Sequence, residues 1–207
     1  MNLLNKDHPK YEPEKWNSNE YVQKTHNCYA YALNVILDEN PEICKKYMEI
    51  TKDTNCHSLK PQIGRRSGYL DEYKLIKLTC ETAIKRLKSD VPCVKKLKKN
   101  QECPDGYYKI ALACKTNTHD YHFYRQDNTG LWSHKLGWRK ATNKDYDGRL
   151  IRDPETANRG IYDIFCGYFM IPNSNSCKEN ISPKTKKYKN NKSGAEIIKE
   201  LIKLNTK

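Results

Sequence analysis

The sequence predicts an α+β fold in which N-terminal helices pack on an antiparallel β-sheet. Apolar residues recur at helical spacing up to about position 88, whereas turn signals and extended, alternating segments follow from position 103. Helices that precede a run of sequential strands are typical of α+β architecture with antiparallel pairing. The 207 residues suffice for one domain with appended segments.

Two segments have the periodicity of amphipathic helices, and an extended lead-in precedes them. Residues 1–25, rich in Pro, Lys, Glu and Asn, form this lead-in, with Tyr11 and Trp16 as anchors. The first helix follows in CYAYALNVILDEN until Pro41, and the second spans residues 71–88. Their apolar positions are Tyr29, Ala32, Leu33, Ile36 and Leu37 in the first helix, and Ile76, Cys80, Ala83, Ile84 and Leu87 in the second.

The strands are predicted from alternation between turn-rich segments. CPDGYYKIALACK indicates a turn and a strand, DYHFYRQ and LWSHK indicate a hairpin across the turn DNTG, and a further strand covers residues 163–171. Residues 26–177 therefore form a single, catalytic-like α+β domain. Residues 178–207 contain nine Lys against three Glu and hold +6 of the formal charge of +13. We expect them to be a basic tail that ends in a short amphipathic helix behind Ser193.

The composition limits which cellular compartment and which partners we expect for the protein. No apolar run is long enough to cross a bilayer, and the opening residues lack the pattern of a secretion signal. The nine cysteines are odd in number, and none are spaced as paired zinc ligands usually are. We therefore expect a soluble, cytoplasmic protein with reduced thiols; for a viral protein the compartment would be the host cytoplasm or the virion.

Cys28 begins the first predicted helix and is the strongest candidate for a reactive side chain. The N–H groups and dipole of a helix N-terminus stabilise a thiolate, the form of cysteine that attacks an acyl carbon. The same N–H groups would bind the resulting oxyanion, with Gln23 or Asn27 as side-chain donors. The alternative is that Cys28 is a small buried residue on an apolar helix.

A base for this thiolate is predicted on the hairpin of residues 120–135. Along the first strand, Asp120 and Tyr124 share the face of His122, because side chains alternate in direction. The next strand returns His134 toward His122 as a direct or diagonal neighbour, depending on the register. An imidazole oriented by a second polar group is the arrangement of nucleophilic catalysis. The alternative is that these histidines simply lie on a half-solvated hairpin.

The order of these motifs resembles the NlpC-type branch of papain-like cysteine hydrolases. The motifs are Cys28 in NCYAYAL, the loop PQIG at 61–64, His122 in HFY and His134 in WSH. The resemblance implies a papain-like thiol hydrolase or acyltransferase that acts on a peptide, isopeptide, amide or ester bond through a Cys28 acyl-enzyme. His122 would be the general base, His134 or Asp120 would orient it, and no metal or cofactor is needed.

The chain departs from that family in three places. Tyr-Ala-Tyr replaces the usual small residues after the cysteine, the PQIG loop lacks the usual acidic residue, and the insertion before His122 is long. The blocks NCYAYALN, DYHFYRQD, GLWSHK and CGYFMIP also resemble those of uncharacterised proteins from large DNA viruses and bacteria. The resemblance therefore leaves the substrate open.

Two further interpretations remain. His119 and His122, spaced HxxH, would ligate a metal with Cys114 or Cys103 only if the strand bends or starts after His119, since a three-residue separation on a strand puts them on opposite faces. Alternatively the chain is a non-enzymatic basic binding or structural protein, associated with nucleic acid or a virion. The Lys-rich segments KRLKSDVPCVKKLKK and KTKKYKNNK, with fifteen tyrosines in the chain, predict weak non-specific contact with nucleic acid.

Overall fold

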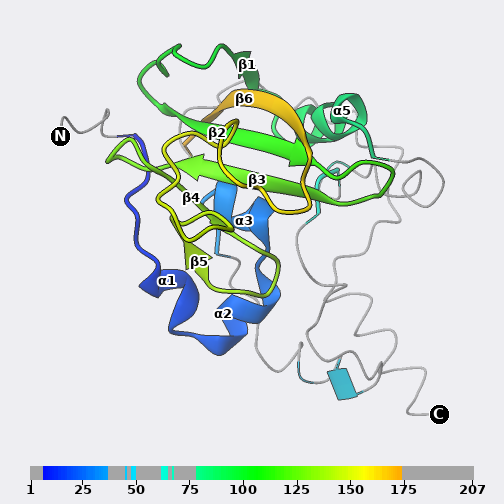
Figure 1. Cartoon of the computed structure of the whole chain (residues 1–207), viewed down its shortest axis with the longest axis vertical. Helices are drawn as coiled ribbons and strands as arrows, with labels where there is room; N and C mark the ends of the chain where they lie inside the picture. Colours follow the sequence, from blue (N-terminus) through cyan, green and yellow to red (C-terminus); the bar gives the residue numbers. More distant parts are fainter. Residues whose placement is uncertain are drawn as a thin grey trace.

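The computed structural model describes residues 7–36, 45, 48–49, 62–64, 67 and 78–173. Its framework is a six-stranded antiparallel sheet in the order β1-β6-β2-β3-β4-β5, on which short helices pack (Figure 1). The predicted α+β class is confirmed. The helices are α1 (Glu14–Asn17), α2 (Glu20–Thr25), α3 (Cys28–Ala32) and α5 (Cys80–Asp90), and the strands are β1 (Lys95–Leu97), β2 (Tyr107–Cys114), β3 (Tyr121–Gln126), β4 (Trp132–Lys135), β5 (Ala141–Thr142) and β6 (Ile164–Pro172).

The strands predicted from alternation are β2, β3, β4 and β6, the longest in the sheet. The DNTG turn joins β3 to β4: the N–H of Asp127 donates to the carbonyl of Leu131 at 2.9 Å. Gly130 closes the turn with a φ of +82°, a conformation that glycine adopts without steric cost. The sequence does not predict β1 and β5, because three and two residues carry too little alternation.

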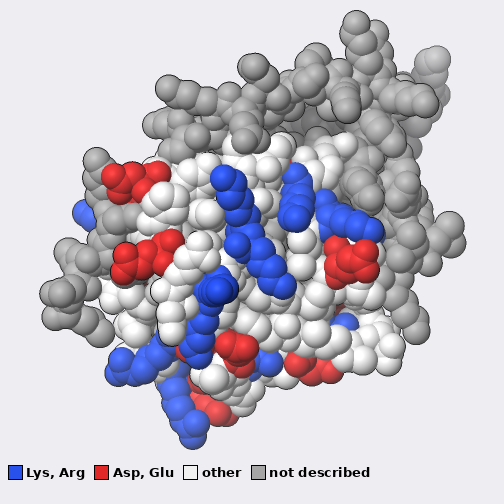
Figure 2. Space-filling model, turned by 90° about the horizontal axis from the view of Figure 1, so that it is seen from above, with Lys and Arg blue, Asp and Glu red and all other residues white. Residues whose placement is uncertain are grey.

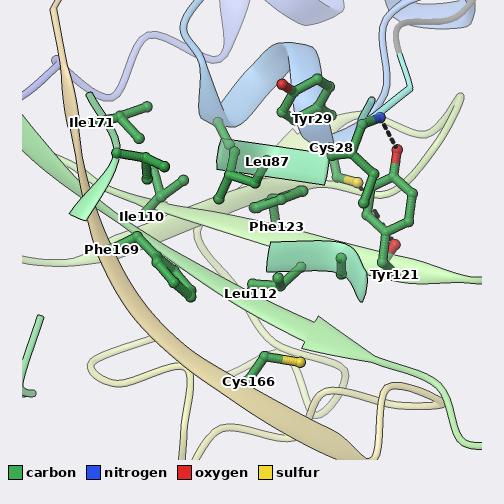
Figure 3. Packing of buried hydrophobic residues seen from close by; sticks show 14 of the residues in the cluster. Cys28, Tyr29, Leu87, Ile110, Leu112, Tyr121, Phe123, Cys166, Phe169 and Ile171 are labelled. Atoms are coloured by element: carbon green, nitrogen blue, oxygen red, sulfur yellow. Dashed lines mark hydrogen bonds between the residues drawn. The ribbon is translucent and has the colours of Figure 1, made fainter. Parts of the chain in front are cut away.

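The two faces of the sheet bury different clusters. On one face Phe123 of β3 packs with Tyr29 of α3 and Leu87 of α5 (Figure 3). On the other face Tyr124 packs with Trp132 and their neighbours in a second cluster. Full burial of one large apolar side chain contributes roughly 1.5–3 kcal/mol, so both clusters hold the central strands in place.

Within the predicted extended lead-in of residues 1–25, the described residues 7–25 are not extended throughout, because α1 and α2 lie among them. Asn19 caps α2, since its side chain accepts from two N–H groups in the first turn of this helix. Trp16 is buried as predicted, and its ring meets the ring of Tyr31 edge-on with 4.9 Å between centroids. Tyr11 is half-buried. The segment thus packs on the domain instead of trailing from it.

The helix that begins at Cys28 is shorter than predicted, since α3 has only five residues. The buried guanidinium of Arg125 donates to the carbonyl oxygen of Tyr31 at 3.3 Å and to Oδ1 of Asn34 at 2.9 Å. Asn34 adopts a φ of +53°, and a left-handed residue at this place ends a helix. Ile36, predicted on the buried face, is therefore 41% exposed.

The second predicted helix is α5, which starts at Cys80 behind a capping Thr79. Its Ala83 and Leu87 are buried against the sheet as predicted. No helix in the described part of the chain is long and apolar enough to cross a membrane. Predictions that lie outside the described residues are those for Leu37, residues 71–77 and the tail 178–207 with its helix.

A disulfide between Cys80 and Cys166 joins the first residue of α5 to β6. Cys93 is also disulfide-bonded. The sequence predicts reduced thiols, and the structure differs because pairing depends on proximity across 86 residues, which spacing does not reveal. Closing a loop of that length stabilises the fold by about 4–5 kcal/mol in the chain-entropy account. The cysteines that remain thiols in the described part are Cys28, Cys103 and Cys114.

Candidate functional site

Two buried histidines meet in the sheet, as the hairpin predicts. Tyr124 pairs directly with His134 across β3 and β4, so His122, two residues earlier, is the diagonal neighbour of His134. Nε2 of His122 lies 2.7 Å from Nδ1 of His134. Each residue is 1% exposed. The hairpin is therefore not half-solvated; its imidazoles are interior groups.

Aromatic rings enclose the two imidazoles. Tyr124 meets His122 edge-on and stacks on His134, with centroids 4.8 and 5.1 Å apart. Tyr162, from the loop between β5 and β6, stacks on His122 at 4.9 Å. The Tyr162 hydroxyl donates to Oδ2 of Asp120 at 3.2 Å. Asp120 thus holds the tyrosine that covers His122, whereas the orienting contact to the imidazole itself comes from His134.

The hydrogen bonds fix the direction of the imidazole chain. The carbonyl oxygen of Lys144 lies 2.9 Å from Nε2 of His134 and can only accept, so this Nε2 carries a proton. In a neutral ring Nδ1 of His134 is then an acceptor, and Nε2 of His122 donates to it. This order of hydrogen bonds leaves Nδ1 of His122 with an unshared lone pair. This nitrogen is the one that a general base would use.

Both imidazoles are neutral at pH 7. Burial lowers the pKa of His122 well below its usual 6.5, and the neighbouring His134 lowers it further. Burial also lowers the pKa of His134 to about 4, although the Lys144 carbonyl and Asp145 act in the opposite direction. Protonating either ring would place a charge in the interior, and a proton on Nδ1 of His134 would also remove the acceptor of the hydrogen bond from His122.

Cys28 is the first residue of α3, as predicted, but its thiol is protonated. Its sulfur lies 3.8 Å from the carbonyl oxygen of Tyr121, the residue before His122. Burial raises the pKa of Cys28 to about 12, which outweighs the helix N-terminus. In the described part of the chain no hydrogen bond joins this thiol to either imidazole. The structure brings His122 and His134 together and places Cys28 beside the same strand, in the cluster on the helix-covered face.

The two predicted oxyanion donors are engaged elsewhere. The side-chain oxygen of Asn27 accepts from the N–H groups of Tyr29 and Ala30, at 3.1 and 3.2 Å. These are the N–H groups that an oxyanion at the start of α3 would need. The Gln23 amide donates to the carbonyl of Trp138 at 3.3 Å. In this arrangement both residues shape the helices and the loop beside Cys28.

A buried lysine, which the sequence analysis does not single out, ties the helices to the sheet. Nζ of Lys135 donates to the carbonyl oxygens of Gln23, His26 and Gly137 at 2.5, 2.6 and 2.8 Å. Three carbonyls replace the water that the ammonium loses on burial. The alternation of LWSHK is the one available signal, because it places position 135 on the helix-covered face opposite His134.

The alternative metal site at HxxH does not form. His119 is exposed and precedes β3, whereas His122 is enclosed by rings. Among the described residues, the group of His, Cys, Asp or Glu ligand atoms close enough to hold one ion is formed by Cys80, Cys114 and Cys166.

Fold and site together define a disulfide-linked α+β protein with an internal His–Tyr cluster. No protein-family model and no solved structure matches the chain. A curated protein, insoluble matrix shell protein 1 of the clam Ruditapes philippinarum, is 31% identical over 169 residues, which cover 78% of this chain and 89% of the clam protein. The chain belongs to the family of this shell matrix protein.

The neutral imidazoles make stability depend on pH. The folded-state pKa of His134 lies near 4 and its unfolded value near 6.5, so between these values the unfolded chain binds the extra proton. We expect the free energy of unfolding to fall as pH drops from 7 to 4, by about 3 kcal/mol from His134 alone. Denaturant titrations at several pH values measure this.

A matched pair of variants assigns the effect. His134→Gln keeps a donor for the Lys144 carbonyl but does not titrate, so its stability should vary less with pH than that of the wild type. His119→Gln, at an exposed histidine, should retain the wild-type dependence. Equal pH dependence in all three proteins would contradict the assignment.

Proposed function

We propose that this chain is a secreted structural component of an extracellular matrix. The observation that carries the proposal is the match to insoluble matrix shell protein 1, which extends over 89% of that protein. Disulfides at Cys80–Cys166 and Cys93 support it, because such bonds persist in oxidising compartments. The proposal favours the non-enzymatic alternative and places the protein outside the cell, where the sequence alone suggests the cytoplasm.

The buried polar groups fit a structural role. His122, His134, Lys135 and Arg125 each have interior partners that close part of the fold. Arg125 pairs with Asp127 at 3.1 Å and lies 4.2 Å over the ring of Tyr31. Buried and satisfied polar groups specify one arrangement of neighbouring elements. A matrix component requires such a durable shape.

The basic surface suggests an anionic partner in the matrix. β1 and β6 lie uppermost in Figure 1, and the view from above shows Lys and Arg side chains across that face (Figure 2). Lys95, Lys96 and Lys98, on and just after β1, are exposed. The same charges explain why weak nucleic-acid contact is expected in solution. In a matrix they would bind acidic polymers through salt-sensitive contacts.

Tissue fractionation tests the matrix role. An antibody against the chain should detect it in the extracellular, detergent-insoluble fraction, and non-reducing peptide mapping there should recover the Cys80–Cys166 disulfide. A cytosolic marker protein of similar size is the control for cell leakage. Recovery in the cytosol with Cys80 and Cys166 as thiols would contradict the proposal.

A second candidate function is hydrolysis by a cysteine nucleophile on an NlpC-type, papain-like architecture. The observation that favours it is the hydrogen-bond chain that leaves the lone pair of Nδ1 on His122, with Cys28 beside the same strand. Cys28 would pass its proton to this nitrogen, and its sulfur would attack the carbonyl carbon of a peptide, isopeptide, amide or ester. The C–N or C–O bond would then break, and the amine or alcohol would leave with the proton held by His122. Water would then release the acyl group from the sulfur.

Alkylation rates separate the two functions. Burial raises the pKa of Cys28 to about 12 and that of Cys103 to about 11, so Cys28 should hold about tenfold less thiolate. Under the matrix role, limiting iodoacetamide on the folded chain labels Cys28 no faster than Cys103, as read by peptide mass spectrometry. Faster labelling of Cys28 that His122→Gln abolishes would support the hydrolase and refute a purely structural site.

A further inference from the structure

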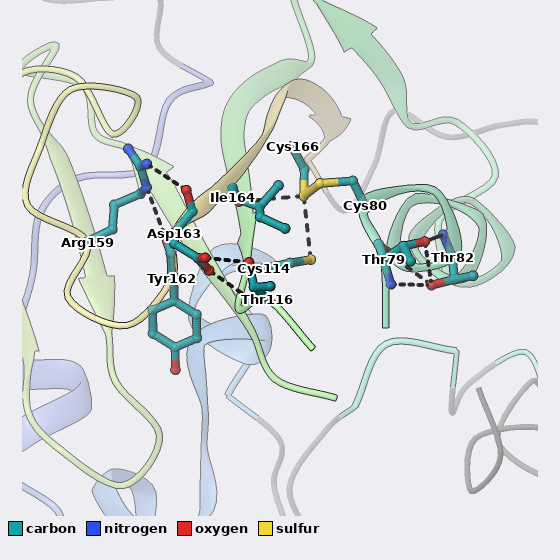
Figure 4. Close-up of a disulfide and its surroundings, with 10 residues drawn as sticks. All are labelled: Thr79, Cys80, Thr82, Cys114, Thr116, Arg159, Tyr162, Asp163, Ile164 and Cys166. Carbon is teal, nitrogen blue, oxygen red and sulfur yellow. Dashed lines mark hydrogen bonds between the residues drawn. A yellow bond between two sulfur atoms is a disulfide. The ribbon is translucent and has the colours of Figure 1, made fainter. Parts of the chain in front are cut away.

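Three cysteine sulfurs from separate elements meet where α5 approaches the end of the sheet. Cys80 begins α5, Cys114 ends β2 and Cys166 lies in β6 (Figure 4). Cys80 and Cys166 form the disulfide, and the sulfur of Cys114 lies 3.5 Å from that of Cys166. All three sulfurs lie within 4.8 Å of one another. We call these three residues the sulfur cluster.

A β-bulge builds this cluster. Along β6, Tyr168 and Met170 belong to the cluster on the face away from α5, and regular alternation would place Cys166 with them. The register between β2 and β6 shifts at Leu112/Ala113, beside Gly167, whose φ is +126°. The extra residue turns Cys166 to the opposite face, where Cys114 lies. The backbone is thus shaped to add a third sulfur to the pair.

The first residue of α5 suits a thiolate. Thr79 and Thr82 form a capping box ahead of an 11-residue helix. The remaining N–H groups of that first turn and the helix dipole favour negative charge at Cys80. Cys80 is half-buried, whereas Cys114 and Cys166 are buried. The sulfur cluster therefore has two interior ligand atoms and one toward the surface.

We propose that the reduced sulfur cluster is a binding site for one thiophilic d¹⁰ cation of the Zn²⁺ class, held by the thiolates of Cys80, Cys114 and Cys166. A tetrahedral ion with sulfur ligands at about 2.3 Å places them about 3.8 Å apart. The observed separation of 3.5 Å between Cys114 and Cys166 is already close to this value. Thiolate ligands select Zn²⁺, Cd²⁺ and Cu⁺ over hard cations. Water fills the fourth position on the side of Cys80.

Metal binding at the sulfur cluster follows reduction of its disulfide. Two molecules of a small thiol reduce the Cys80–Cys166 disulfide to two cysteine thiols and leave as one small-molecule disulfide. The divalent cation then replaces the protons of three thiols, which are released to solvent. The small-molecule disulfide reverses the sequence: it oxidises Cys80 and Cys166 to their disulfide and is itself reduced to two thiols, and the ion leaves as Cys114 regains its proton. This inference goes beyond the proposed matrix role and does not depend on it.

Cobalt titration of the full chain tests the site. The protein is reduced with a phosphine under anaerobic conditions and titrated with Co²⁺, which gives thiolate-to-metal charge-transfer absorption. We expect one equivalent of this signal, displacement of the cobalt by Zn²⁺, and no signal from the oxidised protein. A strong signal from the oxidised protein would overturn the proposal.

Two variants of buried thiols make the test specific. Neither Cys114 nor Cys103 takes part in a disulfide, so Cys114→Ser and Cys103→Ser leave the bonding pattern intact. Cys114→Ser should weaken zinc binding by at least about 100-fold, because loss of a direct ligand exceeds the 10- to 100-fold effect of outer-shell changes. Cys103→Ser should bind as the wild type does. Equal binding by both variants would refute the site.

A measurement on the wild-type chain covers the case in which Cys114→Ser fails to fold. Zn²⁺ should protect Cys80, Cys114 and Cys166 of the reduced protein from alkylation, as read by peptide mass spectrometry. The rate at Cys103 should not change. If Zn²⁺ does not slow the alkylation of the sulfur cluster, the proposal is wrong, whether or not Cys114→Ser folds.

Discussion

Strand β3 is buried on both faces, and the rest of the structure depends on this constraint. Its odd-numbered residues, Tyr121, Phe123 and Arg125, face the helices, while His122 and Tyr124 face the loop between β5 and β6. A shift of one residue in the pairing would exchange the two sets. The helix side would then receive the side chains of His122 and Tyr124, and the guanidinium of Arg125 would leave its acceptors at Tyr31 and Asn34.

The same constraint links the candidate site to the fold. The hydrogen bonds from His122 through His134 to the Lys144 carbonyl join two strands and a loop, and they exist only while His134 is neutral. Tyr162 and Asp120 cover them from outside. A matrix protein uses this hydrogen-bond chain as a fixed contact, whereas a hydrolase would use its terminal lone pair. The protonation state of the Cys28 thiol decides between the two functions.

Much of the sheet and of the histidine pair is predictable from sequence, because both depend on local patterns. Alternation in residues 121–126 and the DNTG turn give the hairpin, and with it the neighbours His122 and His134. The features that the sequence does not predict depend on contacts between residues far apart along the chain. Arg125 binds Tyr31 and Asn34 at the point where α3 ends, and burial of Cys28 raises a pKa that the helix start alone would lower. A bulge in β6 brings Cys166 to Cys114, which no spacing indicates.

Nitrogen-15 NMR of the imidazole rings tests most directly whether the buried pair is neutral. The structure predicts that His122 and His134 are both uncharged at pH 7, with the proton of each ring on Nε2. It further predicts that His134 gains a proton only near pH 4. An imidazolium signal from either ring at pH 7, as a thiolate–imidazolium pair with Cys28 would give, would contradict the account.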